Sequence, residues 1–385
     1  MAELLCYYFS MQNFEKKLDE LKLNSCFRSI KDIDYKEEKF IIVNGKKMLN
    51  LSSNDYLNIS TNKDLKLEFI DRYKNNPEFL FSSASARLLT GTSCAYNKLE
   101  QKFANLFKKD SALIFNTGYQ CNQGIISALL QKNDCIFSDK LNHASIVSGL
   151  KLSSAQHFRY KHNDYENLEK LLKEKRNEFN NAIIISESVF SMDGDIADIK
   201  KLVELKKKYN CLLMVDEAHA FGVFGENLCG VSEEESLLSE VDIITITLGK
   251  ALASSGAICV ANKIIIDYLI NKASSFIFST AIAPVNVMWS NFLLDEKYKF
   301  LKSQKEKLND LFNKVHLRYP TISSSQIIPM ILNDAKLTSN KAQELQNNGF
   351  YVLPINPPTV PQGTSRLRIS LTADIKYEEI CNIFG

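Results

Sequence analysis

The feature that most constrains the fold is a regular alternation of short apolar runs and charged segments in the middle of the chain. The apolar runs are rich in β-branched residues, which is typical of buried strands, and the segments between them resemble surface helices. These runs occupy residues 111–116, 134–138, 182–186, 212–215 and 243–247. The alternation predicts an α/β domain with a doubly wound, mostly parallel central sheet and helices on both faces.

The last of these runs leads into a lysine with unusual surroundings. Residues 243–247 alternate Ile and Thr, and the chain continues through Leu248-Gly249 to Lys250 and then into small residues. A buried lysine is costly unless its charge is paired or lost, and a lysine that loses its proton becomes a nucleophile. The small neighbours would leave room for a flat cofactor beside the amine. The pattern alone also allows a lysine that extends from the strand end to solvent.

A second strand end supplies a carboxylate and a histidine. The run 212–215 is followed by Asp216 and His219, and ligands of open α/β sheets bind at the carboxyl ends of the strands. The chain between Asp216 and Lys250 is long enough for one crossover and a further strand. Pyridoxal phosphate needs a lysine to hold its aldehyde and a carboxylate to keep its pyridine nitrogen protonated. Lys250 and Asp216 therefore predict a pyridoxal phosphate site.

Asp216-Glu217-Ala218-His219 also spells the DEAH box of helicases. A helicase needs a phosphate loop that ends in Gly-Lys-Ser or Gly-Lys-Thr. The Gly-Lys pairs of this chain continue as Gly45-Lys46-Lys47 and Gly249-Lys250-Ala251, so the sequence argues against a helicase.

Charge and cysteine content exclude further function classes. The 385 residues carry 47 basic and 45 acidic side chains, and a net charge of +2 gives no electrostatic basis for binding nucleic acid or a membrane. The nine cysteines contain no C-x-x-C pair, which predicts reduced thiols in a cytoplasmic protein. The five histidines lack ligand spacing, so no metal is expected. The apolar N-terminus has no basic segment, which argues against a signal peptide or membrane span, and it leaves Met1 and Met11 as alternative starts.

Outside the central region the pattern is less regular. Residues 12–24 place leucines at helical spacing, and residues 39–50 predict a hairpin turned by Asn44-Gly45. A long charged helix is expected over residues 285–317, followed from Ser324 by short strands and a helix. The expected division is an N-terminal helix and hairpin segment (1–50), a large α/β domain (51–285) and a small α+β C-terminal domain (286–385).

Several further residues are candidates for binding. Gly118 follows the run 111–116 and begins a helix, whose free N–H groups can hold an anion. His143 also begins a helix, as an ordinary cap or as an imidazole stacked on a cofactor ring. Arg366 and Arg368 share one face of a strand, where they could grip a carboxylate or form a surface ion pair.

Seven motifs occur in the order in which one enzyme family carries them. They are S-S-N-D-Y-L (52–57), G-Y-Q-x-N (118–122), N-H-A-S (142–145), E-S-V-F-S-M-D-G-D (187–195), V-D-E-A-H-A-x-G (215–222), T-L-G-K-A (247–251) and P-P-T-V-P-x-G-x-x-R-L-R (357–368). Together they resemble the α-oxoamine synthase family of fold-type I pyridoxal phosphate enzymes, from about Arg28 to the C-terminus. The resemblance implies the fold-type I transferase fold, a homodimer with active sites at the subunit interface, and no nucleic-acid or membrane partner.

The resemblance also implies roles for individual residues. Lys250 would bind the cofactor and later move protons at the substrate Cα, while Asp216 would pair with the pyridinium nitrogen and His219 with the ring hydroxyl. His143 would stack on the ring. The remaining cofactor contacts implied are Gly118, Tyr119, Ser191, Thr247, Ser279 and Thr280, the last two reaching the phosphate of the neighbouring subunit. The substrate contacts implied are Arg28, Asn54, His143, Thr359 and Arg368.

Within the family the chain is most similar to the branch that condenses L-alanine with a pimeloyl thioester, carried by CoA or by an acyl carrier protein. Relatives that use glycine with acetyl-CoA or succinyl-CoA remain an alternative. A non-catalytic scaffold subunit is a third alternative, but such subunits lack the lysine that is present here as Lys250.

The chain departs from the family pattern at four places. The glycine-rich segment of many relatives is Ser82–Arg87 here, and the histidine often found a few residues later is Tyr96. The glycine usual shortly after the lysine is Ala253, and the arginine before P-P-T-V-P is Asn356. The change at Asn356 bears on the choice of acyl substrate.

Overall fold

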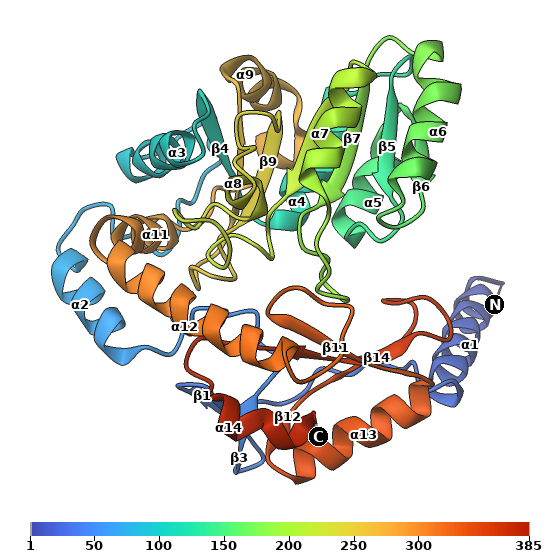
Figure 1. The fold of residues 1–385 in the computed structure, drawn as a ribbon, viewed down its shortest axis with the longest axis vertical. Coiled ribbons are helices and arrows are strands. Elements are labelled where there is room, and N and C mark those ends of the chain that lie inside the picture. The colour runs from blue at the N-terminus through green and yellow to red at the C-terminus, as the bar shows by residue number, and fades with distance from the viewer. Residues whose placement is uncertain (1, 385) are drawn as a thin grey trace.

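The large lobe is built around a mostly parallel sheet, as predicted (Figure 1). The computed structural model describes the backbone of residues 2–384 and the side chains of residues 11–384. Within that part of the chain the sheet has seven strands. In spatial order they are β4 (Ser111–Phe115), β10 (Ala257–Ala261), β9 (Ile243–Thr247), β8 (Leu212–Asp216), β7 (Ala182–Glu187), β5 (Cys135–Asp139) and β6 (Gln156–Tyr160).

Two strands of this sheet were not predicted. β10 runs antiparallel between β4 and β9, so β9 and β10 form a hairpin instead of a crossover. β6 is the edge strand, and its sequence Q-H-F-R-Y is largely polar and exposed. The other neighbouring strands pair in parallel.

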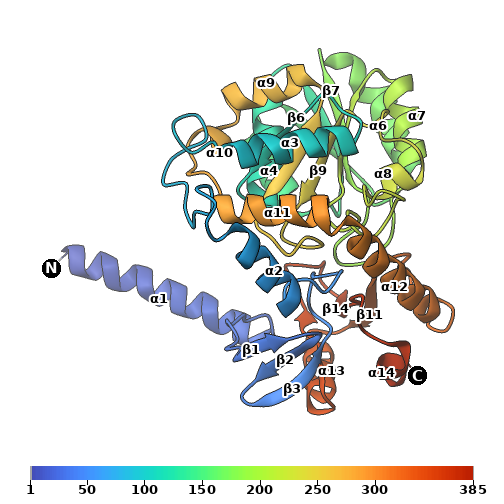
Figure 2. The same ribbon diagram turned by 90° about the vertical axis from the view of Figure 1, so that its left-hand side faces the viewer.

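Helices cover both faces of the large sheet, which confirms the predicted layering (Figure 2). On one face, Ile126, Ile146 and Leu269 pack with sheet residues such as Ile136. On the other face, Leu168 packs with a second core. The helices of this lobe are α3 (Cys94–Leu106), α4 (Gly118–Leu129), α5 (Ala144–Leu152), α6 (Tyr165–Lys175), α7 (Ile199–Lys208), α8 (Val231–Glu234), α9 (Lys263–Lys272) and α10 (Ser274–Ile277).

The small lobe joins both ends of the chain. One of its sheets has the order β1-β2-β3-β12, and β12 pairs in parallel with β3 through Phe350 and Leu49. The other sheet has the order β11-β14-β13. Its strands and helices are β1 (Tyr35–Glu37), β2 (Phe40–Val43), β3 (Lys46–Asn50), β11 (Ile327–Asn333), β12 (Phe350–Tyr351), β13 (Pro354–Ile355), β14 (Ser365–Ser370), α13 (Ala335–Asn347) and α14 (Tyr377–Ile380). The predicted hairpin is confirmed, and φ values of 50° at Asn44 and 72° at Gly45 form its turn.

The remaining helices connect the lobes or lie outside them. Phe69 of α2 (Lys63–Tyr73) packs against Trp289 of α11 (Pro284–Glu296). α1 (Ala2–Leu23) projects from the small lobe (Figure 2). The single helix expected over residues 285–317 is wrong: the chain forms α11 (Pro284–Glu296) and α12 (Tyr298–His316). The break falls at Lys297, whose amine contacts the carboxylate of Glu68 on α2. No helix in the described part of the chain is both long and apolar enough to cross a bilayer.

Candidate active site

The carboxyl ends of the central strands bring the predicted lysine, carboxylate and histidines to one edge of the sheet. Asp216 is the last residue of β8, and Lys250 lies in the loop that joins β9 to β10. His143 is the N-cap of α5, which follows β5. His219 lies in the turns after β8 and is buried.

A chain of hydrogen bonds links Lys250 to the small lobe. Lys250 Nζ lies 2.7 Å from His219 Nε2, and His219 Nδ1 lies 2.5 Å from the hydroxyl of Tyr56. The Tyr56 hydroxyl donates to Asn54 Oδ1 at 3.2 Å. Arg368 on β14 donates to the same Asn54 oxygen at 3.0 Å and to the Tyr56 hydroxyl at 3.3 Å. Residues from four separate motifs therefore form one polar cluster.

Burial tunes the charges of this cluster. It lowers the pKa of Lys250 to about 8, against the opposing attraction of Asp216 and Glu187. It also lowers the pKa of His219 well below its ordinary value, and the positive charges of Lys250 and Arg368 act in the same direction. A neutral imidazole beside a lysine with a lowered pKa can accept or return a proton.

Asp216 is fixed by a buried amide. Asn122 on α4 donates to Asp216 Oδ2 at 2.6 Å, and the backbone N–H of Ala218 donates to Oδ1 at 2.9 Å. The amide oxygen of Asn122 accepts from Thr245 Oγ1 at 3.1 Å. These contacts hold the orientation of the carboxylate, and the side chains of Asn122 and Asp216 are both buried.

Hydrogen bonds at its Nδ1 and at its backbone N–H fix His143, which is an exposed residue. The N–H of Ser145 donates to its Nδ1 at 3.2 Å, and Ser145 Oγ lies 2.8 Å from the same atom. Its own backbone N–H donates to Glu187 Oε1 at 2.5 Å. Glu187 ends β7 and is buried, which raises its pKa well above the ordinary value.

The N-terminus of α4 forms a close-fitting cradle. Thr117 caps it by accepting from the N–H of Gln120, and Gly118 is its first residue. A Cβ on Gly118 would lie 2.7 Å from Thr247 Oγ1 at the end of β9, so a larger residue here would displace the Thr247 hydroxyl. Gln120 reaches Ser279 Oγ at 3.4 Å. The helix N-terminus and the Thr247 hydroxyl thus face one another across a position without a side chain.

The predicted substrate contacts fall into two places. Arg368 and Asn54 lie in the polar cluster, and Arg368 Nε also donates to the carbonyl oxygen of Ser191. Arg28 and Thr359 lie apart from that cluster and bond to each other, with Arg28 Nη2 donating to Thr359 Oγ1 at 2.6 Å. Tyr119 at the start of α4 is exposed. Thr280 is also exposed and forms an isolated bridge with Ala86.

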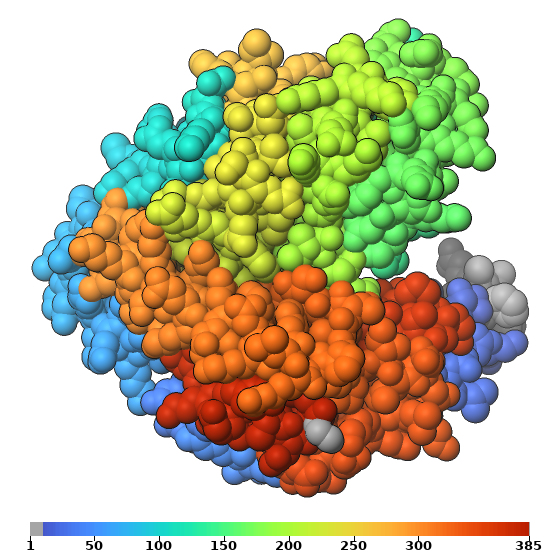
Figure 3. Space-filling model, in the orientation of Figure 1, coloured from blue at the N-terminus to red at the C-terminus, as the bar shows by residue number. Residues whose placement is uncertain are grey.

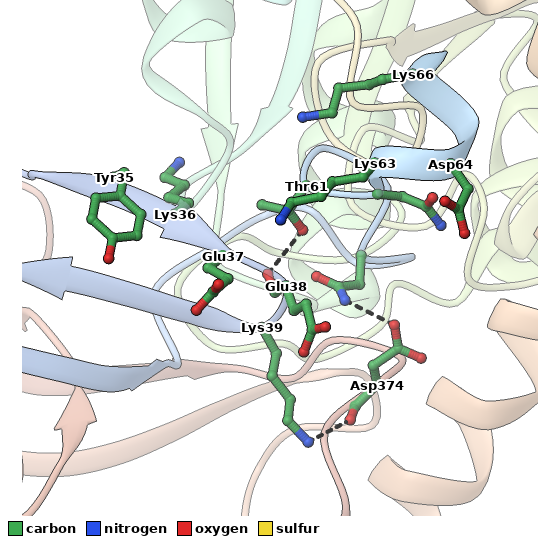
Figure 4. Close-up of a pocket in the computed structure, with 12 residues that line it drawn as sticks. Tyr35, Lys36, Glu37, Glu38, Lys39, Thr61, Lys63, Asp64, Lys66 and Asp374 are labelled. Atoms are coloured by element: carbon green, nitrogen blue, oxygen red, sulfur yellow. Dashed lines mark hydrogen bonds between the residues drawn. The ribbon is translucent and has the colours of Figure 1, made fainter. Parts of the chain in front are cut away.

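The residues at this strand edge fit the chemical groups of pyridoxal phosphate. A helix N-terminus with a glycine cradle suits a phosphate, and an anchored carboxylate suits a pyridine N–H. Lys250, with its lowered pKa, suits an aldehyde, and the imidazole of His143 offers a flat ring. The hollow of about 650 Å³ in Figure 4 lies elsewhere, between β1 and α2, and the residues lining it include none of the predicted site residues.

Comparison with known proteins agrees with this chemistry. The model of the family "Aminotransferase class I and II" matches residues 46–384. A protein of Haemophilus influenzae with the provisional name 8-amino-7-oxononanoate synthase is 45% identical over 376 residues, which is 96% of this chain and 98% of that protein.

The chain belongs to the class I and II aminotransferase family, and within it to the α-oxoamine synthases. Its cofactor is pyridoxal phosphate. Solved members of the family have the same fold. The serine palmitoyltransferase of S. paucimobilis, solved with bound PLP, has a TM-score of 0.85 and 26% identity over 98% of this chain and 96% of that chain. The 8-amino-7-oxononanoate synthase of Francisella tularensis has a TM-score of 0.70 and 28% identity over 87% of this chain and 95% of that chain.

Sequence reasoning gave no role to three residues of this family site. Tyr56, Asn122 and Glu187 contact His219, Asp216 and His143 respectively. All three lie inside the family motifs, so the motifs contained the signal. Their partners could not be assigned from the sequence because each contact joins segments that are far apart in the chain.

Proposed function

We propose that the enzyme condenses L-alanine with a pimeloyl thioester. The products are 8-amino-7-oxononanoate, CO2 and the free thiol of the acyl carrier, which places the enzyme in biotin biosynthesis. The observation that carries the proposal is the polar cluster, in which Arg368 and Asn54 adjoin the Lys250–His219 pair. The 45% identity to the H. influenzae relative supports the alanine reaction over the glycine and serine reactions.

In this proposal Arg368 and Asn54 bind the carboxylate of alanine. Arg368 is buried, and its guanidinium donates to uncharged oxygens of Ser191, Asn54, Ser370 and Tyr56. Among the side chains of residues 11–384 it has no carboxylate partner, so an added carboxylate would be its charge partner. A fixed carboxylate orients the Cα–H bond towards Lys250, 2.7 Å from His219. Lys250 then takes the Cα proton, and His219 and Tyr56 stabilise the protonated amine by rearranging their hydrogen bonds.

Bound pyridoxal phosphate would supply the electron sink that makes this proton removable. Asp216 would keep a positive charge on the pyridine nitrogen, and Asn122 keeps Asp216 in place. His143 would cover one side of the ring. Gly118, Tyr119, Thr247 and Ser191 would hold the cofactor at its phosphate end and edge, and Arg28 and Thr359 would contact the acyl substrate.

We further propose a homodimer in which Ser279 and Thr280 complete the phosphate site of the partner. Beside them lies a patch of exposed apolar residues, the 80–278 patch, formed by Leu80, Phe81, Leu88, Leu89 and Phe278. Hydrogen bonds from Ala281 to Ser85 and from Val285 to Leu80 tie its two segments together. An apolar surface beside an active site marks an interface. The three-part division at residues 50 and 285 and a cytoplasmic location are also part of the proposal.

The deciding experiment is a thiol-release assay combined with the visible spectrum of the holoenzyme. We expect L-alanine to change the cofactor spectrum and pimeloyl-CoA to release thiol only in its presence. Lys250→Ala should fold, lose the visible band of the lysine-linked cofactor and lose at least about a thousandfold in turnover. Lys336→Ala on the exposed face of α13 is the matched control. A response to glycine or serine but not alanine would replace the proposed substrate, and undiminished turnover in Lys250→Ala would refute the mechanism.

A further inference from the structure

The segment 140–163, beside the candidate active site, carries exposed positive charge. Residues 140–163 contain Lys140, Lys151, Arg159 and Lys161 but no Asp or Glu, although the whole chain is nearly neutral. All four cations are exposed, and none forms an ion pair with another residue in the described range 11–384. His162, in the same segment, bonds to Asp139 and Asp195.

These cations lie on one face of the large sheet. In β6, Phe158 and Tyr160 point to the core that α6 covers, so His157 and Arg159 point to the opposite face. That face is covered by α5, whose Ile146 packs with Ile136 on it. Lys140 is joined to this group because its carbonyl oxygen accepts from Arg159. We name Lys140, Lys151, His157, Arg159 and Lys161 the basic face.

The basic face continues into the active-site opening. Lys140 and Lys151 line a hollow of about 730 Å³ whose opposite wall is the loop 357–362. Tyr119 and Asn142, neighbours of Gly118 and His143, line the same hollow. Figure 3 shows the large and small lobes separating at this edge of the molecule. A long flexible thioester that lies in this hollow would therefore extend from the basic face to the neighbourhood of Gly118 and His143.

We propose that the basic face is the docking surface for an acidic carrier protein that presents the acyl thioester on a phosphopantetheine arm. The proposal rests on the proposed function and deepens it by locating the surface at which a carrier protein would dock. Charge complementarity of this kind steers a transient partner and sets its orientation.

The spread of the basic face favours a protein over free coenzyme A. Lys140 and Lys151 line the hollow, but Arg159, Lys161 and His157 lie outside the residues that line it. A nucleotide seated in the hollow would leave those three uncovered. Leu152, which follows Lys151 at the end of α5, is 59% exposed and offers the apolar contact that a protein interface needs.

The first test is direct binding of holo-acyl carrier protein, from the same source organism, to the holoenzyme. We expect binding that weakens as NaCl rises from about 50 to about 300 mM, because surface charges are screened. The double variant Arg159→Glu/Lys161→Glu should lose at least about tenfold in affinity. Arg159→Lys/Lys161→Arg should keep it. Lys272→Glu/Lys336→Glu changes two exposed lysines elsewhere by the same charge and should also keep it.

The second test compares kcat/KM for pimeloyl thioesters of the carrier protein and of CoA. We expect Arg159→Glu/Lys161→Glu to lower the carrier-protein value about tenfold or more and to change the CoA value less than about twofold. An equal loss for both thioesters would mean that the face binds nucleotide phosphates, and no loss for either would mean that it binds neither. Both results would overturn the proposal.

The binding test also separates this proposal from the proposed function. If neither pimeloyl thioester turns over but the carrier protein binds through the basic face, the proposed substrate is wrong and the docking surface stands. If pimeloyl-CoA turns over and the carrier protein does not bind the wild-type enzyme, the docking surface is wrong and the reaction stands.

Discussion

Ala253 has a backbone conformation that glycine adopts at lower cost. Its φ is 45°, in the left-handed region, where a Cβ costs about 1–2 kcal/mol. Its N–H closes a turn onto the carbonyl oxygen of Lys250 at 3.0 Å. The departure from the family glycine at this position therefore leaves strain in the backbone three residues after Lys250.

We predict that Ala253→Gly stabilises the protein by roughly 0.5 kcal/mol. Relief of about 1–2 kcal/mol of strain exceeds the entropy cost of about 0.5–1 kcal/mol that a glycine adds. The free energy of unfolding in urea measures the effect. Ala86→Gly is the matched control, because Ala86 is not among the residues with positive φ, and it should destabilise. An equal loss of unfolding free energy in both variants would contradict backbone strain at Ala253.

The pKa of Lys250 predicts how cofactor binding depends on pH. Burial lowers this pKa to about 8 from 10.5, and only the neutral amine attacks an aldehyde. The rate of pyridoxal phosphate uptake by the apoprotein should therefore rise with pH and reach half its plateau near pH 8. Stopped-flow absorbance measures it, with a blocked lysine derivative as the reference reactant. If the pH at half-maximal rate were as high as that of the blocked lysine, burial would not lower the pKa of Lys250.

At the scale of single elements, β14 shows how a short pattern can position a site. The R-L-R pattern predicted that Arg366 and Arg368 share a face, and both contact the 190–195 segment, through Asp193 and Ser191. Leu367 between them is buried in the core. One strand thus anchors the small lobe with Arg366 and presents Arg368 to the polar cluster.

We predict that Arg368→Lys raises KM for L-alanine about tenfold to a hundredfold. A lysine cannot reproduce the forked guanidinium, and one lost charge-assisted hydrogen bond costs about 1.5–3 kcal/mol. The visible spectrum of the holoenzyme should stay unchanged because the cofactor contacts remain. Arg366→Lys, on the same strand, should leave KM for alanine within about twofold. A change in kcat alone for Arg368→Lys would argue against a carboxylate contact.

Elements with a strong local pattern could be predicted from the sequence. The buried runs that became β4, β5, β7, β8 and β9 could be recognised because burial on both faces leaves a continuous apolar pattern. β6 was missed because an edge strand tolerates polar residues such as Gln156 and Arg159. The break at Lys297 depends on Glu68, which is distant in the chain, and the position of Tyr56 depends on both lobes. Contacts of this kind become visible only in the folded chain.

At the scale of the whole molecule, the 80–278 patch predicts association. Phe81 is 79% exposed and Phe278 is 84% exposed, and single exposed aromatics are common but a contiguous group is not. The patch lies beside Ser279 and Thr280, which the proposed homodimer places at the phosphate of the partner.

We predict that Phe81→Glu/Phe278→Glu converts the proposed dimer to a monomer and lowers the affinity for pyridoxal phosphate. Two buried carboxylates would oppose each other across a two-fold interface, and the phosphate site would lose its second subunit. Sedimentation velocity measures the mass, and titration of the visible band measures the affinity. Ile264→Glu on α9, where Ile264 is 81% exposed, is the control. A double variant that remains dimeric would place the interface elsewhere.

The hairpin of β9 and β10 has a consequence for how the enzyme must move. Thr247 pairs with Ala257, and the N–H of Leu248 donates to the carbonyl oxygen of Gly256 at 3.0 Å, so the loop bearing Lys250 is clamped at both ends. It cannot swing outwards without separating two strands in the interior of the sheet. We therefore expect Lys250 to stay in place during turnover. A shift of the small lobe, which carries Arg368, would then be the motion that widens the site for substrate and product.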